Sequence, residues 1–354
     1  MLNIVKKEEP SRGRELLTRL IAVVAALAAT GLIMMFLGLN PFTVYVKMVE
    51  GATGTSYRLQ ETINKTIPLL VLSLGTAVAF KMKFWNIGAE GQFYMGAFGA
   101  AGVAFACPDV PGILLIPMMM AAGFVCGGLW AMIPAVLKAK WQTSETLVTL
   151  MMNYIATTWI TYLQYGPWKD PKGAGFPRMP YFSDNGVLPK VFGIHIGWII
   201  ALVLVLIVHL LFKQSKLGYK IAVVGESETT ARYAGINPTK VMLIAILISG
   251  GICGMAGMMQ ASGIERSLTN QLSGGLGFTA VITTWLSKLS APAIAVVSFL
   301  FAILLQGGNY IQTALQVPSS LASLIQGTIL FFVLGSEFFL SYKVVRKHKA
   351  QQEG

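Results

Sequence analysis

The chain has 354 residues, of which 55% are hydrophobic and only 12% are charged, and its mean hydropathy is +0.65. Soluble globular proteins average about 25% charged residues, so this composition excludes an ordinary soluble domain and indicates an integral membrane protein. The net charge is +12, from 27 basic and 15 acidic side chains. No segment between the apolar windows is long enough for a catalytic domain, which excludes a membrane-anchored enzyme.

The charged residues separate apolar windows that predict about ten transmembrane segments. A helix needs about 20 residues to cross about 30 Å of hydrocarbon. We therefore predict an all-α, polytopic integral membrane protein. The predicted crossings are about 20–39, 66–80, 93–106, 113–137, 145–163, 196–212, 241–261, 276–287, 291–311 and 318–340.

The basic residues are shared unevenly between the two sides that these crossings define. With a cytoplasmic N-terminus, 19 of the 27 lie on the cytoplasmic side and 8 on the outer side. Because cytoplasmic loops carry the excess of lysine and arginine, both termini are expected in the cytoplasm of a multi-pass plasma-membrane protein. Attraction to anionic membrane lipid then accounts for the positive charge, and no nucleic-acid partner is expected.

The expected organisation is a transmembrane domain between two basic cytoplasmic ends. The parts are the N-terminus 1–19, the transmembrane domain 20–340 and the tail 341–354. The transmembrane domain includes an outer loop at 164–195 and a cytoplasmic loop at 213–240. The polar segment 41–65 is expected outside the membrane. The three cysteines and three histidines lack metal-ligand spacing, so no metal site is expected.

Two predicted crossings are too short or too polar for ordinary transmembrane helices. The second has 15 uncharged residues before Lys81, which is about 22 Å of helix, and a polar run at 84–92 follows it. The eighth is apolar only over 276–287, which predicts a broken or re-entrant element. In a chain of two five-span halves, these interruptions occupy equivalent positions and indicate a substrate path.

Glu90 is the first candidate functional residue, because an ionisable side chain next to hydrocarbon needs a partner or a polar cavity. Asn86 and Gln92 place further hydrogen-bonding groups beside it. Helix capping is the alternative, with Asn86 as the N-cap and Glu90 in the first turn, where the helix dipole favours an acid. The sequence leaves both roles open.

The cytoplasmic stretch 223–238 has the features of a short helix that docks on a partner. Ser227 is a suitable N-cap, and Gly235 followed by Pro238 ends the helix after about seven residues. A protruding Tyr233 and Ile236 suit a groove on another protein. A solvated connector helix is the alternative.

Glycine and threonine residues cluster at 274–284. The glycines permit a sharp re-entry, and the hydroxyl groups can bond to backbone or to a polar ligand. Close helix packing is the alternative. Packing is also our interpretation of the glycines at 250, 251, 254 and 257.

Three stretches together resemble one family of membrane proteins. Residues 84–92 (FWNIGAEGQ) resemble an F-N-I-G-x-E-G-Q signature, residues 225–237 resemble a G-E-N-x-x-A-A-R-Y-A-G-I loop, and residues 277–280 match G-F-T-A. These motifs occur in this order in permease subunits of ATP-binding-cassette (ABC) importers, in the branch related to ribose and branched-chain amino-acid permeases. The nearest resemblance is to nucleoside, or simple-sugar, permeases served by lipoprotein receptors of the basic-membrane-protein type.

The resemblance implies a type II importer-like fold and two groups of functional residues. The translocation pathway is expected to include Asn86, Glu90, Gln92, Phe278 and Thr279. ATPase coupling is expected to use Gly225, Glu226, Ala231, Arg232, Tyr233, Gly235 and Ile236. The implied partners are an ABC ATPase subunit, a second permease that is homologous or identical, and an extracytoplasmic substrate-binding lipoprotein. The chain needs no cofactor of its own, because ATP is bound by the partner subunit.

These features predict a permease that imports a small polar solute, with nucleosides expected first and a sugar as the alternative. No GxxxxGK[ST] phosphate-binding loop is present, so the chain is not expected to be an enzyme. An ion-coupled secondary transporter is the other alternative, but it would normally carry several ionisable groups within its spans. Here only Glu90, Glu145 and Glu337 lie near span ends.

Overall fold

The computed structural model describes residues 2–6, 12–173, 175 and 177–346, so parts of the predicted terminal segments lie outside the described residues. The helices are α1 (Arg12–Phe36), α2 (Pro41–Thr53), α3 (Ser56–Lys81), α4 (Ala89–Ala106), α5 (Gly112–Trp141), α6 (Glu145–Tyr165), η1 (Asp184–Gly186), α7 (Gly197–Gln214), α8 (Lys216–Glu226), α9 (Glu228–Tyr233), α10 (Pro238–Gln260), η2 (Ala261–Glu265), α11 (Leu276–Leu286), α12 (Ala291–Ala314) and α13 (Ser319–Ser341). Two antiparallel strand pairs join β1 (Leu2–Lys6) to β4 (Tyr342–Arg346) and β2 (Lys190–Val191) to β3 (Ile194–His195).

The predominance of helices confirms the fold class, but the count of about ten crossings is not confirmed. Each predicted window coincides with a helix. Among the described residues, six helices are long and apolar enough to cross a membrane, or seven if α1 and α2, bent by 116°, form one span. The helix α11 has 11 residues, too few to span hydrocarbon, as the sequence predicted for this element.

The helix α3 corrects the prediction of a short second crossing. It runs unbroken for 26 residues and includes Arg58 and Lys65, which were expected in a polar outer segment. Long basic side chains can extend toward water while the backbone stays helical, so charge limits the apolar window without ending the helix. The rest of that segment forms α2, which begins where Asn40 accepts the backbone N–H of Phe42. An irregular segment does follow α3, at residues 82–88, as predicted.

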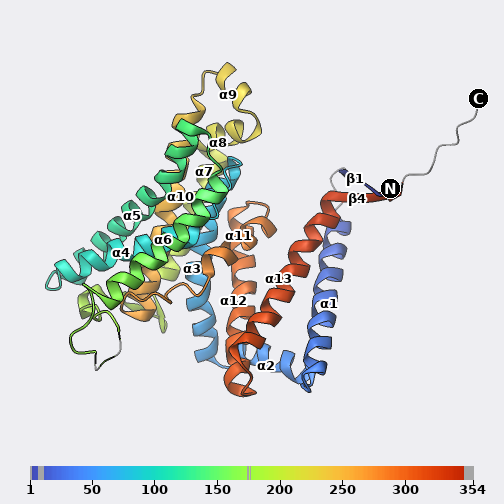
Figure 1. The fold of residues 1–354 in the computed structure, drawn as a ribbon, viewed down its shortest axis with the longest axis horizontal. Helices are drawn as coiled ribbons and strands as arrows, with labels where there is room; N and C mark the ends of the chain where they lie inside the picture. The colour runs from blue at the N-terminus through green and yellow to red at the C-terminus, as the bar shows by residue number, and fades with distance from the viewer. Residues whose placement is uncertain (1, 7–11, 174, 176, 347–354) are drawn as a thin grey trace, which may run out of the picture. The chain divides into compact units, whose positions relative to one another are not determined.

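The chain divides into two compact units, Ser56–Ala302 and the two ends Met1–Thr55 with Ile303–Gly354. In the larger unit, the apolar windows of α3 and α10 are 83% and 67% buried, against 28% for α5 and 22% for α7. Figure 1 shows α10 running among α3, α4 and α5, and these helices pack against it. The core of this unit therefore lies around α3 and α10, while α5 and α7 leave most of their surface exposed.

Glycines on α10 allow this close packing. A Cβ atom at Gly254 would overlap the carbonyl oxygen of Gly123 on α5, and one at Gly257 would overlap the carbonyl oxygen of Phe93 on α4. A Cβ atom at Gly250 would lie 2.6 Å from the carbonyl oxygen of Gly127. Small residues let helix backbones approach in this way, so the packing interpretation of these glycines is confirmed.

We expect Gly254→Val to lower the thermal unfolding midpoint sharply, because its side chain must displace the backbone of α5. Overpacking of this kind costs about 1–3 kcal/mol or more. The matched control is Gly327→Ala in α13, where a Cβ atom would meet nothing within 4 Å. The measurement is the midpoint in detergent by fluorescence-detected size-exclusion chromatography. Equal midpoints for the two variants would contradict the packing role.

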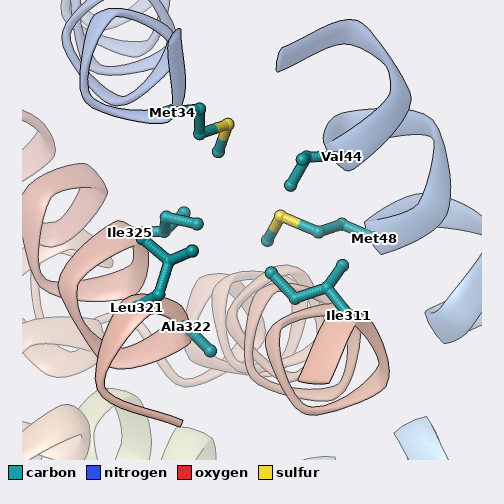
Figure 2. Close-up of a cluster of buried hydrophobic side chains, with 7 residues drawn as sticks. All are labelled: Met34, Val44, Met48, Ile311, Leu321, Ala322 and Ile325. Atoms are coloured by element: carbon teal, nitrogen blue, oxygen red, sulfur yellow. The ribbon is translucent and has the colours of Figure 1, made fainter. Parts of the chain in front are cut away.

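The smaller unit has an apolar cluster of its own. Figure 2 shows side chains from α1, α2, α12 and α13 converging, namely Met34, Val44, Met48, Ile311, Leu321, Ala322 and Ile325. The strands β1 and β4 pair in register from Leu2↔Arg346 to Lys6↔Tyr342. Residues 2–6 and 342–346 therefore lie side by side.

The predicted outer loop is held to the rest of the larger unit near η2. Ser262 donates a hydrogen bond to the carbonyl oxygen of Gly186 (2.5 Å). His195 is buried against Gly263, where burial, assisted by the charge of Lys190, lowers the pKa of its imidazole to about 4. His195 is therefore neutral near pH 7 and fills space between the loop and η2 without carrying charge.

Candidate functional site

The segment between α3 and α4 is held by its own amide side chains. Asn86 Nδ2 donates to Gln92 Oε1 (3.1 Å), and Gln92 Nε2 donates to Asn86 Oδ1 (2.9 Å). Asn86 Oδ1 also accepts the N–H of Gly88 (3.0 Å), and both amide side chains are buried. The N-cap of α4 is Gly88, so the prediction that Asn86 occupies this position was wrong. Asn86 instead shapes the turn that leads into the helix.

Two polar residues on neighbouring helices fix this segment, and the sequence analysis missed both. Asn153 on α6 accepts the N–H of Gly91 (2.8 Å) and donates to the carbonyl oxygen of Ile87 (2.9 Å). Ser249 on α10 accepts from Asn86 (3.4 Å). An uncharged polar residue in an otherwise apolar window was the available signal, since such groups inside a membrane need partners.

Glu90 joins the first turn of α4 to the start of α11. Its Oε2 atom accepts the backbone N–H of Gly277 at 2.7 Å, and its side chain is 7% exposed. The first amides of a helix lack partners within that helix, and its dipole favours an acid there. Glu90 therefore caps a helix, as one alternative proposed, but the capped helix is α11 and not its own.

Gly277 has no room for a side chain at this contact. An added Cβ atom would lie 2.5 Å from the backbone nitrogen of Glu90 and 2.6 Å from its Cα. The FWNIGAEGQ and GFTA stretches, almost 190 residues apart, are thus in direct contact. The structure brings together the two interrupted regions that the sequence analysis selected.

The side chains of α11 divide into a packed set and an open set. Thr283 hydrogen-bonds to Ser73 on α3, and Thr284 donates to the carbonyl oxygen of Ser73 (2.9 Å). Both threonines are buried, so packing explains them. Phe278 is 40% exposed, and Thr279 is half-buried, with its hydroxyl donating to the carbonyl oxygen of Gly275 (3.3 Å). These two side chains keep exposed surface.

The predicted docking helix is α9, which has six residues. Ser227 caps it by accepting the N–H of Thr230 (3.2 Å), as predicted, and Gly235 follows with a positive φ of 73°. Tyr233 is 90% exposed, Arg232 is also exposed and Ile236 is half-buried. The helix therefore carries an exposed aromatic ring and an exposed cation.

Two of the residues expected to couple to the ATPase, Gly225 and Glu226, belong to a separate helix, α8, which precedes α9. Gly225 packs on the last turn of α3, where an added Cβ atom would overlap the carbonyl oxygen of Lys81. Glu226 forms an exposed ion pair with Lys83 (3.6 Å). Ala231, within α9, is fully buried.

A small cavity of about 60 Å³ lies between α9 and neighbouring parts of the larger unit. Its walls combine side chains of the segment after α3, the end of α5 and α9, including Met82, Phe84, Lys138, Glu228 and Arg232. The segment 82–92 therefore connects the two groups of candidate residues. Its first residues face α9, and Glu90 contacts α11.

Comparison with known proteins assigns the family. The model of the branched-chain amino acid transport system / permease component family matches residues 58–334. The chain belongs to this family. A similar relative is the glucose ABC transporter permease protein TsgB13 of Haloferax volcanii, which is 31% identical over 92% of this chain and 89% of its own. The guanosine permease NupP of Bacillus subtilis is 30% identical over 91% and 93%, and the nucleoside permease NupB of Lactococcus lactis 28% over 91% and 92%.

The family membership confirms the resemblance that the three motifs indicated. The chain is the permease component of an ABC importer and a multi-pass membrane protein. Permease components of this family are not themselves enzymes, and they work with ATPase and substrate-binding partners.

Proposed function

We propose that this permease carries nucleosides into the cell. The importer would comprise a separate ATPase docked on α9, a second permease and an extracytoplasmic lipoprotein. The Glu90–Gly277 hydrogen bond is the main support for the path, because it unites both interrupted regions in one place. Two of the three relatives described above are named for nucleosides or guanosine, which supports this solute class. The relative named for glucose makes a sugar the second candidate.

In this proposal, α11 provides the surface that the solute passes. Phe278 and Thr279 are the accessible residues of the predicted path, and an aromatic ring beside a hydroxyl group suits a base or sugar ring. Asn86, Glu90 and Gln92 are buried and bonded to protein groups. In this proposal Glu90 holds α11, and Asn86 and Gln92 hold the segment that carries Glu90.

The proposed orientation places both termini and α9 in the cytoplasm. The distribution of 19 basic residues inside and 8 outside supports it, and so does the β1–β4 pairing of the chain ends. The exposed cation and aromatic ring of α9 then face the compartment that contains ATP.

The test is uptake by the four-component complex reconstituted in liposomes, with radiolabelled guanosine, adenosine, uridine and glucose as separate probes. We expect ATP-dependent uptake of at least one nucleoside and no uptake when the ATPase is omitted. ATP-dependent uptake of glucose alone would establish the sugar candidate instead. Uptake that persists without ATP, or that follows an imposed proton gradient, would contradict the importer assignment.

A further inference from the structure

Two tryptophans connect the segment after α3 to the end of α11. The rings of Trp85 and Trp285 are stacked, with centroids 5.2 Å apart and planes inclined by 24°. Phe80, in the last turn of α3, packs against both, at centroid distances of 5.6 and 5.8 Å. The three rings form a contact between parts of the chain about 200 residues apart, which we call the indole stack.

The indole stack is only partly buried. Trp85 is 45% exposed and Trp285 is 40% exposed, whereas Phe80 is 5% exposed. Tryptophans often anchor membrane proteins at the lipid interface. A tryptophan can serve as such an anchor without stacking on a second tryptophan. Here Trp85 and Trp285 cover each other, and they belong to the segment after α3 and to α11. The geometry therefore favours a contact that positions α11 on this segment.

The same segment is connected to α8 and α9 immediately before Trp85. Gly225 packs on the backbone of Lys81 and Met82, and Met82 and Phe84 line the cavity beneath α9. Because α8 is followed directly by α9, a displacement of α9 reaches residues 81 and 82 through Gly225. The adjoining residue, Trp85, is the next contact along this path.

Glu145 at the start of α6 provides a second connection. It accepts the N–H of Trp85 (3.5 Å) and forms an ion pair with Lys138 (2.8 Å). Lys138 also lines the cavity beneath α9 and lies over the ring of Phe84, 5.1 Å from its centroid. Both connections reach Trp85 from the α9 side, and the indole stack and the turn to Glu90 lead from Trp85 to α11.

We propose that Trp85 and Trp285 are positioning residues that transmit movement of the ATPase-docking helix α9 to α11. The proposal rests on the proposed docking of the ATPase at α9. The stack holds the C-terminal end of α11, while the Glu90–Gly277 hydrogen bond holds its N-terminal end. Because α11 is held at both ends by one segment, movement of that segment shifts α11 as a unit.

The experiment follows the exposure of α11 in the complex with the ATPase. A single cysteine is placed at Phe278, in a background in which Cys107, Cys126 and Cys253 are replaced by alanine. The rate of labelling by a fluorescent maleimide is measured with and without ATP plus vanadate. We expect nucleotide to change this rate in the parent. The change should shrink about twofold to tenfold in Trp85→Ala and in Trp285→Ala, which is the effect of losing one aromatic contact on an equilibrium.

Two further variants separate positioning from folding. Trp285→Phe keeps an aromatic ring and should restore most of the response. Trp141→Ala removes a tryptophan that is 65% exposed at the end of α5 and takes no part in the stack, and it should respond like the parent.

Co-purification of the ATPase with the parent is measured first, and its absence would contradict the proposed function. If the ATPase binds, an unchanged labelling response in both alanine variants overturns the inference. A parent rate that nucleotide does not alter overturns it as well, because α11 then does not move.

Discussion

Replacing Glu90 with alanine is expected to reduce ATP-dependent uptake about tenfold, while the permease remains in the membrane and keeps its ATPase. The substitution leaves the N–H of Gly277 buried without an acceptor, and an unsatisfied buried donor costs about 1–3 kcal/mol. A penalty of about 1.4 kcal/mol corresponds to a tenfold change in the population of the correctly held α11. The measurement is initial uptake by the reconstituted complex, together with the ratio of permease to ATPase recovered.

Glu90→Gln is the informative companion, because its amide oxygen still accepts from Gly277. We expect it to retain most of the transport. Glu265→Ala removes an exposed acid at the end of η2 and serves as the control for loss of charge. If Glu90→Gln is as inactive as Glu90→Ala, the carboxylate charge itself is required and capping of α11 does not explain the residue. Normal transport by Glu90→Ala would remove Glu90 from the mechanism.

Reversing the charge at Arg232 is expected to release the ATPase without removing the permease from the membrane. Arg232 is exposed on α9, and an interface residue of this kind contributes about 2 kcal/mol or more when it lies at the centre of a contact. Arg232→Glu should therefore weaken ATPase binding about thirtyfold. Binding of the ATPase to permease in nanodiscs measures this directly.

Gly235→Pro tests the same contact through the backbone. Gly235 has a φ of 73°, whereas proline fixes φ near −65°, so the substitution forces the end of α9 into another conformation. An added Cβ atom at Gly235 would meet nothing within 4 Å, so the rest of the fold should be unaffected. Lys213→Glu, an exposed charge reversal at the end of α7, should bind the ATPase normally. Unchanged binding by both α9 variants would show that the ATPase docks elsewhere.

Composition and charge were sufficient to predict a multi-pass helical protein, because hydrocarbon admits few charged groups and leaves long uncharged windows. The helix α9 was also predictable, since Ser227 and Gly235 act through local hydrogen bonds and backbone conformation. The boundaries of α3 were not predictable in this way. Arg58 and Lys65 end the apolar window but not the helix, whose backbone bonds do not depend on side-chain polarity.

The partner of Glu90 depended on contacts that no local pattern contains. The sequence placed the acid at the start of α4, where the dipole of its own helix offered a sufficient explanation. In the structure, the carboxylate of Glu90 accepts the N–H of Gly277. This hydrogen bond depends on the close approach of α4 and α11. The stacking of Trp85 on Trp285 is equally non-local. The sequence alone therefore determined which segments are interrupted and which family they resemble. Only the tertiary structure decided that the interruptions meet, because the partners are far apart in the chain and close only after packing.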